Sequence, residues 1–285
     1  MSIKLTHIYH TYSKGTPFER LALNDVSLEI AKGEVVAIIG HTGSGKSTLV
    51  QHLNGLLKPD KGSATIDAID ITTKAAKAKE ARQQVGMVFQ YPEHQLFAET
   101  VFEDIAFGPR NKGFNEEEVK KAVREAMEFV GLDYEVFAQR SPFQLSGGQM
   151  RRVAIAGVVA MNPDYLVLDE PSAGLDPRSR NAVFKEIMSL HQSRGIAIVL
   201  VTHSMEEAVK YADRLLVINA GRVLFDGKPA NIFKEHGAEL VQVGVDVPQV
   251  YKLAALLREK GLSLPENIKD DMSLVKAIKE AKGWK

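Results

Sequence analysis

The stretch GHTGSGKST, residues 40–48, restricts the possible folds of this chain more than any other part of its sequence. It follows EVVAIIG, a continuous apolar run typical of a buried strand, and leads into KSTLVQHLNGLL, which has the pattern of a helix. The stretch matches G-x-x-x-x-G-K-[ST], in which backbone N–H groups at the helix start, aided by the helix dipole, cradle phosphate groups. The sequence therefore predicts a nucleotide-phosphate site on a strand–loop–helix unit.

Carboxylates that can complete such a site lie at the C-terminal end of the buried strand YLVLDE, residues 165–170. We expect Lys46 to reach the β- and γ-phosphates, and Ser47 and Asp169 to bind Mg²⁺, the carboxylate usually through water. Glu170 points the other way along the strand, so it is predicted to polarise the attacking water. The nucleotide-binding candidates in the loop are Gly40, His41, Thr42, Gly43, Ser44, Gly45, Lys46, Ser47 and Thr48.

The rest of the chain alternates buried strands with helices, which indicates an α/β fold with a parallel sheet. Residues 3–30 read as antiparallel strands, and residues 115–130 as a strongly amphipathic helix. From about residue 246 the pattern changes to two short amphipathic helices. The predicted divisions are a main domain at 1–230, a helical part of it at about 91–160, and a C-terminal helical extension at 231–285.

The composition argues against several classes of protein. Lys+Arg and Asp+Glu both number 36, so the formal net charge is zero, and this balance argues against a nucleic-acid partner. The chain has no cysteine, which excludes disulfides and thiolate chemistry. The longest apolar runs, such as IAIVLV at 196–201, are far shorter than the ~18–20 residues of a membrane helix, and we expect a soluble chain.

A second glycine-rich stretch, QLSGGQMRR at 144–152, lies about a hundred residues after the first and lacks the phosphate-binding lysine. Together with FQ at 89–90, VLDEPSAGLD at 167–176 and VTH at 201–203, it resembles the nucleotide-binding subunits of ABC transporters. The resemblance covers roughly residues 3–230 and implies a P-loop ATPase domain with a mixed RecA-like core sheet, an antiparallel β subdomain and an α-helical subdomain. It also implies that two such subunits pack head to tail, so that this loop contacts ATP bound to the partner. The residues of this signature loop are Leu145, Ser146, Gly147, Gly148 and Gln149.

The same resemblance assigns further roles. Gln90 is similar to the glutamine that contacts Mg²⁺ or the water, Asp176 to an aspartate at the dimer seam, and His203 to a histidine that contacts the γ-phosphate. It leaves the division of catalytic work between Glu170 and His203 open. For adenine stacking we expect Tyr12, with Tyr9 and His10 as close alternatives.

Four stretches resemble one branch of the family, the ATPases of energy-coupling factor (ECF) transporters: YSKGTPFERLAL, GHTGSGKSTLVQHLNGLLKP, VFQYPEHQLFAETVFEDIAFGPRN and SGGQMRRVAIAGVVAMNP. The TPFE insertion and the tyrosine of QYPEHQLF are most similar to the second, A′-type ATPase of that group. The resemblance implies an ATPase that powers uptake of vitamins or transition-metal ions from the cytoplasmic face of the cell membrane, as a peripheral subunit. It also implies three kinds of partner: a second related ATPase, a transmembrane scaffold, and substrate-binding membrane subunits. The C-terminal extension would then help to hold the two ATPases together.

The segment 91–109, YPEHQLFAETVFEDIAFGP, is the predicted docking surface for the membrane partner. It mixes acidic residues with apolar residues that are expected to be exposed, and in the family it receives short arginine-bearing helices. The alternative is an ordinary amphipathic helix packed on its own domain. The candidate docking residues are Glu93, Leu96, Phe97, Val101, Phe102, Glu103 and Asp104.

Two other functions remain open at this stage. An ordinary ABC transporter ATPase would pair with an identical copy instead of a related one. A soluble ABC ATPase acting on DNA or ribosomes usually carries long coiled-coil insertions or two cassettes, whereas this chain has one cassette and no long heptad run.

Overall fold

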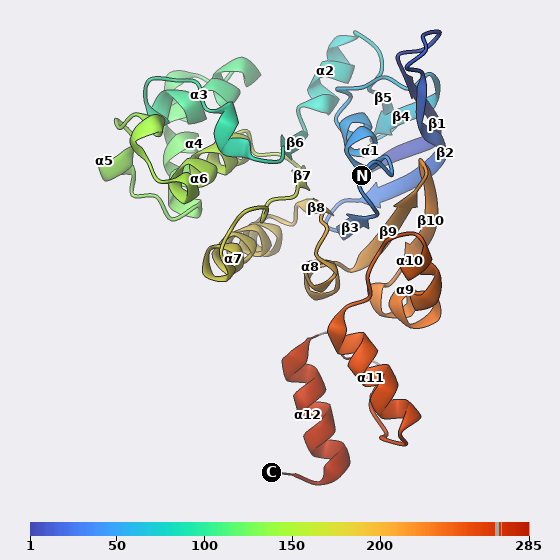
Figure 1. Cartoon of the computed structure of the whole chain (residues 1–285). Helices are drawn as coiled ribbons and strands as arrows, with labels where there is room; N and C mark the ends of the chain where they lie inside the picture. Colours follow the sequence, from blue (N-terminus) through green and yellow to red (C-terminus); the bar gives the residue numbers. More distant parts are fainter. Residues whose placement is uncertain (266–267, 269, 285) are drawn as a thin grey trace.

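The structure is a computed structural model that describes residues 1–265, 268 and 270–284, and within these residues the strands form two sheets (Figure 1). The larger sheet has strand order β10-β9-β3-β8-β7-β6. Its inner strands pair in parallel, and β10 pairs with β9 as an antiparallel hairpin at one edge. These strands are β3 (Val35–Ile39), β6 (Val85–Val88), β7 (Tyr165–Asp169), β8 (Ala197–Val201), β9 (Arg214–Asn219) and β10 (Arg222–Gly227).

The smaller sheet is antiparallel, with order β2-β1-β4-β5. Its strands are β1 (Ser2–Tyr12), β2 (Arg20–Ala31), β4 (Lys61–Ile66) and β5 (Ile69–Asp70). The two sheets are connected through β3, because alternate residues of a strand face opposite sides of a sheet. Val36 and Ile38 pack with the antiparallel sheet, whereas Val35, Ala37 and Ile39 pack with the helices on the other side. The predicted mixed core sheet and antiparallel sheet are thus both present.

A separate group of helices forms the predicted helical subdomain and stands on one side of the core sheet in Figure 1. Buried apolar residues of α3, α4 and α6 fill its interior, and they belong to the same apolar cluster as one face of the core sheet. The elements of this group are η1 (Pro92–Gln95), α3 (Val101–Lys112), α4 (Glu116–Phe129), α5 (Tyr134–Phe137), η2 (Pro142–Gln144) and α6 (Gly147–Val159).

The remaining helices flank the core sheet or form the C-terminal extension. Helix α9 packs on β9, β10 and α8, whereas α11 and α12 project away from the main body (Figure 1). Among the residues described, no helix has the length and apolar character that a membrane crossing requires. These helices are α1 (Lys46–Leu53), α2 (Ala76–Arg82), α7 (Pro177–Arg194), α8 (Met205–Tyr211), α9 (Pro229–Glu235), α10 (Gly237–Gln242), α11 (Gln249–Glu259) and α12 (Asp271–Lys282).

Candidate nucleotide and catalytic site

The first glycine-rich loop joins β3 to α1, as the sequence predicts, and its backbone shape requires glycine. Gly40 has φ 154° and Gly45 has φ 112°, a region that other residues rarely adopt. A Cβ atom at Gly40 would lie 2.2 Å from the carbonyl oxygen of Ile218, and one at Gly45 would lie 2.7 Å from that of Ala22. The loop therefore passes so close to neighbouring backbone that only glycine fits at these two positions.

The side chain of Lys46 is buried and folds back over this loop. Its Nζ donates to the carbonyl oxygens of Gly40, at 2.7 Å, and His41, at 3.0 Å. Burial lowers the pKa of Lys46, while the nearby carboxylates of Glu170 and Asp169 act in the opposite direction. The ammonium group thus lies at the helix start, and its hydrogen bonds to described residues go to backbone carbonyls, which an anion can replace.

Three side chains from different strand ends meet at one point. Glu170 follows β7, Gln90 lies two residues after β6, and His203 lies two residues after β8. Gln90 Nε2 donates to Glu170 Oε2 at 3.0 Å, and His203 Nε2 lies 2.8 Å from Glu170 Oε1. Glu170 is therefore in direct contact with both of the other residues predicted as catalytic.

The backbone of Glu170 has φ 52°, which is uncommon for a residue other than glycine. Its N–H donates to the carbonyl oxygen of Val201 at 2.9 Å, which ties the turn to β8. Strained backbone of this kind is concentrated at functional sites, where the surrounding structure holds it in place.

Asp169 is buried beside the phosphate loop. Burial raises the pKa of its carboxyl group, and a hydrogen bond from the Ser47 hydroxyl partly offsets this rise. Ser47, Asp169 and Gln90 together offer hydroxyl, carboxylate and amide oxygens, which are the hard ligands that Mg²⁺ prefers.

Tyr12 lines a cavity of about 150 Å³ together with Gly43, Lys46 and Thr48. Its hydroxyl lies 3.2 Å from the Thr48 hydroxyl, and its side chain is 40% exposed. Of the alternatives, His10 is buried beneath Tyr12, and Tyr9 lies under the ammonium group of Lys61. Among the three candidates, Tyr12 is the one that faces this cavity.

Arg20 lines the same cavity and was missed in the sequence analysis. Its guanidinium donates to the carbonyl oxygen of Gly43 at 2.9 Å. Its position directly after the TPFE insertion could have drawn attention to Arg20. An exposed arginine at the start of a strand belongs to no motif that would predict nucleotide binding.

The second glycine-rich loop is the start of α6. Ser146 caps this helix by accepting a hydrogen bond from Gln149 N, and the Gln149 side chain accepts one from Ser146 N at 3.0 Å. Among the residues described, a Cβ atom added at Gly147 or Gly148 would meet nothing within 4 Å outside its own turn. A cavity of about 270 Å³ adjoins this helix start, with Arg152 and Ser179 among its lining residues.

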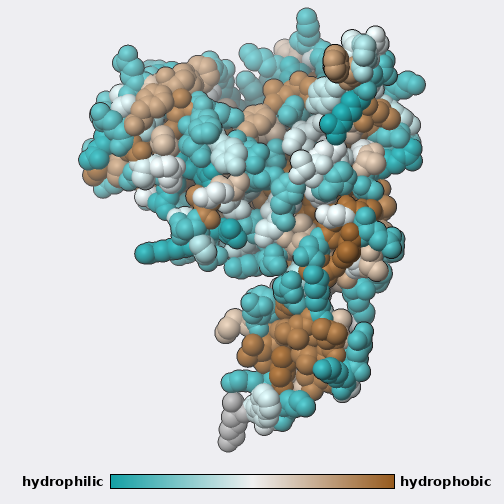
Figure 2. All heavy atoms as spheres, viewed as in Figure 1, coloured by the Kyte–Doolittle hydropathy of each residue, from teal (hydrophilic) through white to brown (hydrophobic). Residues whose placement is uncertain are grey.

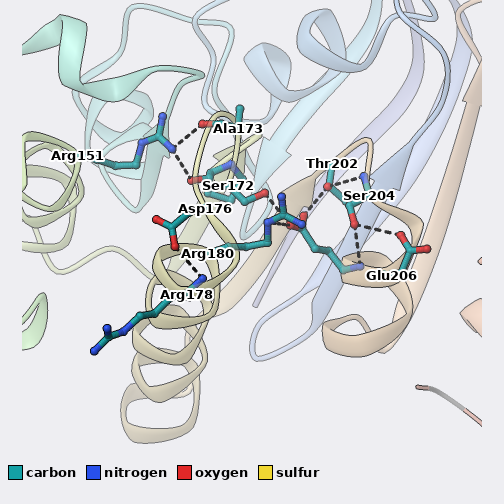
Figure 3. A network of polar contacts seen from close by, with 11 residues as sticks. Arg151, Ser172, Ala173, Asp176, Arg178, Arg180, Thr202, Ser204 and Glu206 are labelled. Carbon is teal, nitrogen blue, oxygen red and sulfur yellow. Dashed lines mark hydrogen bonds and ion pairs between the residues drawn. The ribbon is translucent and has the colours of Figure 1, made fainter. Parts of the chain in front are cut away.

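The loop after Glu170 is held from two sides by buried charged residues that the sequence analysis missed (Figure 3). Arg151 of α6 donates to the carbonyl oxygens of Pro171 and Ala173, at 3.3 and 2.8 Å. Glu207 of α8 accepts from the Ser172 and Thr202 hydroxyls, both at 2.6 Å. This loop therefore lies between the second glycine-rich helix and the segment that carries His203.

Asp176 ends the same loop and caps α7. Its carboxylate accepts from the backbone N–H of Arg178, at 2.9 Å, and Ser179, at 3.2 Å (Figure 3). Hydrogen bonds with Ser179, from its hydroxyl and then its backbone N–H, hold the pKa of Asp176 below its usual value. The residue is exposed on the surface, where the sequence analysis expects a dimer seam.

Comparison with known proteins agrees with this geometry. A family profile for ABC transporter proteins matches residues 23–173. The energy-coupling factor transporter ATP-binding protein EcfA2 of Clostridium tetani is 55% identical, over 94% of this chain and 93% of that protein. The chain belongs to the ABC transporter family. EcfA2 of Clostridium perfringens is 53% identical, over 94% of each chain.

Solved structures of this ABC family have the same fold. One is cbiO1 of Clostridium perfringens, part of the ABC transporter complex cbiONQ, with TM-score 0.73 and 36% identity over 89% of this chain and 98% of that one. Another is the dimeric cassette MJ0796 bound to ADP and Pi, with TM-score 0.71 and 32% identity over 80% of this chain and 98% of that one. As an ABC transporter ATPase, the chain binds ATP and couples its hydrolysis to transport.

The apolar part of the segment 91–109 in this ABC ATPase differs from the sequence prediction. Leu96 and Val101 were expected to be exposed, and this expectation is wrong, because both are buried in the core of the helical subdomain. Phe102 is partly buried and packs against that core. Phe97 is 61% exposed and lies edge-to-face on Phe107, so these two rings form the exposed apolar surface of this segment.

Three of the four acidic residues of the segment are paired within the chain, and the fourth, Glu99, is exposed. Glu93 contacts Arg151, and Glu103 contacts Arg110. Asp104 accepts from the backbone N–H groups of residues 97 and 98, each at 2.9 Å. These three acidic residues therefore help to hold the segment in shape.

Proposed function

We propose that this chain is the second ATPase of an ECF importer, which uses ATP and Mg²⁺ to power uptake of vitamins or transition-metal ions. It works at the cytoplasmic face of the cell membrane, with a related ATPase, a transmembrane scaffold and substrate-binding membrane subunits as partners. The observation that carries this proposal is the contact of Glu170 with both Gln90 and His203 beside the lysine of the phosphate loop. The names of the EcfA2 relatives support the choice of transporter.

The proposed work of each side chain follows from its surroundings. Lys46 binds the β- and γ-phosphates by exchanging its two carbonyl partners for phosphate oxygens. Glu170 orients and polarises the attacking water, because Gln90 and His203 hold its carboxylate in position. His203 is placed to donate toward the γ-phosphate from the same point, and Tyr12 supplies the face on which adenine stacks.

Mg²⁺, when bound, neutralises the charge that develops on the transferred phosphoryl group. Ser47, Asp169 and Gln90 would hold it. Across residues 1–265, 268 and 270–284, no group of three or more His, Cys, Asp and Glu side chains could hold a metal by itself. A partial set of protein oxygens is typical of Mg²⁺ sites, which keep several waters and use substrate phosphates as further ligands.

The open surface at Gly147 and Gly148 supports the proposed head-to-tail dimer. Glycine destabilises a helix by up to about 1 kcal/mol relative to alanine, and no contact among the described residues requires it at these two positions. An anion that approaches the backbone N–H groups of this helix start would require the absence of a Cβ atom. The phosphate of a nucleotide bound to the partner ATPase fits that requirement.

The proposed docking site for the scaffold is a groove of about 330 Å³ beside α3. Leu96, Phe97, Phe107 and Met161 supply an apolar lining, and the Asp104 carboxylate lies at the same groove. A short amphipathic helix with one cationic residue suits such a groove. Phe97 and Phe107 are the exposed contact surface, and Leu96 supports them from the core.

The C-terminal extension offers a second surface for the partner ATPase. Figure 2 shows apolar side chains gathered on the projecting helices. Leu253 and Leu256 are exposed on α11, and Met272 and Val275 are exposed on α12, each pair at helical i, i+3 spacing. We assign the extension, within residues 231–285, to dimerisation, because two adjacent apolar stripes of this kind are unfavourable in water.

The decisive test of the site is Glu170→Gln in the assembled transporter. This change keeps the shape of the side chain but removes the negative charge, so ATP hydrolysis should fall by roughly 10²-fold or more while ATP binding persists and the closed dimer accumulates. Glu206→Gln is the matched control, because Glu206 is exposed on the neighbouring helix and contacts only Ser204 among its described hydrogen bonds. Full turnover in Glu170→Gln would exclude the assigned role.

The transporter assignment is tested by purifying the tagged chain from its native membranes in mild detergent and identifying the bound proteins by mass. A different but related ATPase, a polytopic scaffold and small membrane proteins are the expected partners. Recovery of identical copies with a single type of membrane partner would indicate an ordinary homodimeric ABC transporter.

A further inference from the structure

Arg151 occupies an unusual position, since it is a charged side chain only 3% exposed in the second turn of α6. Its Nε and one terminal nitrogen each donate to a separate Glu93 oxygen, both at 3.1 Å, which is a bidentate pair. The other terminal nitrogen donates to the carbonyl oxygens of Pro171 and Ala173. One guanidinium group therefore joins three segments that are far apart in the sequence.

The first segment carries the proposed docking surface. Glu93 lies in η1, three residues after Gln90 and four residues before Phe97. A partner that presses on the exposed ring of Phe97 acts on the same short stretch that holds Glu93. The planar guanidinium fork resists sliding of Glu93 along α6, because moving either oxygen would break a charge-assisted hydrogen bond.

The second segment is the loop that follows Glu170. Ala173 N donates to the carbonyl oxygen of Glu170 at 3.1 Å, so Pro171 and Ala173 belong to the same tight turn as the catalytic carboxylate. The left-handed backbone of Glu170 leaves this turn little freedom to adjust locally. A shift of Arg151 would therefore be transmitted to the carboxylate of Glu170.

The third segment is α6 itself, which begins at the signature loop. Ser146 caps the helix only five residues before Arg151, so the two lie on one short rigid element. A displacement of the signature loop by the partner's nucleotide would therefore move Arg151 through α6. A displacement of Phe97 by the scaffold would move Arg151 through Glu93.

We propose that Arg151 is a positioning residue, which couples the docking segment and the signature helix to the catalytic Glu170 of the same chain. The proposal rests on the function proposed above, because it assumes that Glu170 acts in hydrolysis and that segment 91–109 receives the scaffold. It predicts that the membrane complex stimulates hydrolysis by fixing the position of this guanidinium group.

The experiment compares ATP hydrolysis by the full-length ATPase pair before and after the membrane subunits are added. The two variants are Arg151→Lys, which keeps the charge but loses the fork, and Glu93→Gln, which keeps the shape but loses the charge. We expect the stimulation by the membrane subunits to fall roughly 3- to 30-fold in each, with ATP affinity near that of the wild type. Arg124→Lys is the control, since Arg124 forms an exposed pair with Glu135 in the same subdomain.

Two results would overturn the proposal. One is a wild-type degree of stimulation in both variants. The other is an equal fall in basal and stimulated rates that leaves their ratio unchanged, which would show a purely structural role. If Arg151→Lys does not fold, Glu93→Gln decides the question alone. Failure of the underlying function is separate, because it would appear as full hydrolysis by Glu170→Gln, whatever the two variants at Arg151 and Glu93 do.

Discussion

The two glycine-rich loops of this ABC ATPase differ in what surrounds their glycines. In the first loop, a Cβ atom at Gly40 would lie 2.2 Å from a carbonyl oxygen of β9. In the second loop, both glycines are helical, and among the described residues a Cβ atom at Gly147 or Gly148 would meet nothing within 4 Å outside its own turn. Contacts within this chain explain the glycines of the first loop, whereas the part of the chain that the structure describes offers no such contact for those of the second.

This difference separates two reasons for using glycine. The glycines of the first loop serve folding, because the strand–loop–helix unit cannot form with any other residue at positions such as Gly40. The glycines of the second loop leave a helix start open toward the solvent, where an anion can approach the backbone. The two loops should therefore respond in opposite ways to the same substitution.

Gly40→Ala is the change with the largest expected effect. The added methyl group collides with backbone and also forces alanine into φ 154°, so we expect a loss of about 3 kcal/mol or more of folding stability. Thermal or urea unfolding of the purified chain measures this loss. Unfolding at the wild-type midpoint would contradict the steric account of the first loop.

Gly148→Ala should have the opposite effect, with folding stability preserved and ATP hydrolysis reduced. Stability should stay the same or rise by up to about 1 kcal/mol, because alanine is the better helix former and its methyl group would clash with no other described part of the chain. ATP hydrolysis by the assembled pair should fall roughly 10²-fold, since the methyl group displaces the partner's nucleotide from the helix start. The check is to measure unfolding and turnover on one preparation, and a variant that hydrolyses ATP at the wild-type rate would argue against the dimer.

The sequence alone was enough to predict the two loops and the elements beside them, because the patterns that indicate them are local. The phosphate loop, the strand ends at Glu170 and His203, and the signature helix each combine a motif with an apolar strand or helix pattern. Helix α2 was missed because its residues, AKAKEAR, lack an apolar period, and α8 was missed because it is a short helix of seven residues. Both depend on their neighbours more than on their own sequence pattern.

Burial within the helical subdomain could not be read from the sequence. An amphipathic pattern shows that one face of 91–109 is covered, but it does not show which apolar residues stay outside, and so Leu96 and Val101 were misplaced. The buried contacts of Arg151 and Glu207 were missed for a related reason. Charged residues are expected on the surface, and only the three-dimensional packing shows that these two are paired.

Ser146→Ala tests the second loop through its cap. Removing the hydroxyl leaves the N–H of Gln149 without its acceptor, so we expect about 1 kcal/mol of lost stability. Ser146→Asp sharpens the result, because aspartate caps a helix as well as serine does but brings a negative charge to the proposed phosphate site. Wild-type stability with reduced turnover in Ser146→Asp is the expected outcome, and equal turnover in both variants would weaken the anion assignment.

Acid should affect the helix after the first loop more than the helix after the second, because only α1 carries an imidazole. His52 is fully buried in α1, and its Nδ1 lies 2.8 Å from the Thr48 carbonyl oxygen. Burial lowers the pKa of His52, with the Thr48 hydrogen bond acting in the opposite direction and His10 adding to the decrease. The unfolded chain therefore binds more protons than the folded chain below the ordinary histidine pKa of about 6.5, and stability should fall as pH decreases through that value.

His52→Asn keeps a donor near Nδ1 but does not titrate, so the pH dependence of the unfolding free energy between about pH 7.5 and 5.5 should flatten by about 1 kcal/mol or less. An identical pH dependence in the wild type and His52→Asn would show that the buried imidazole does not titrate with unfolding.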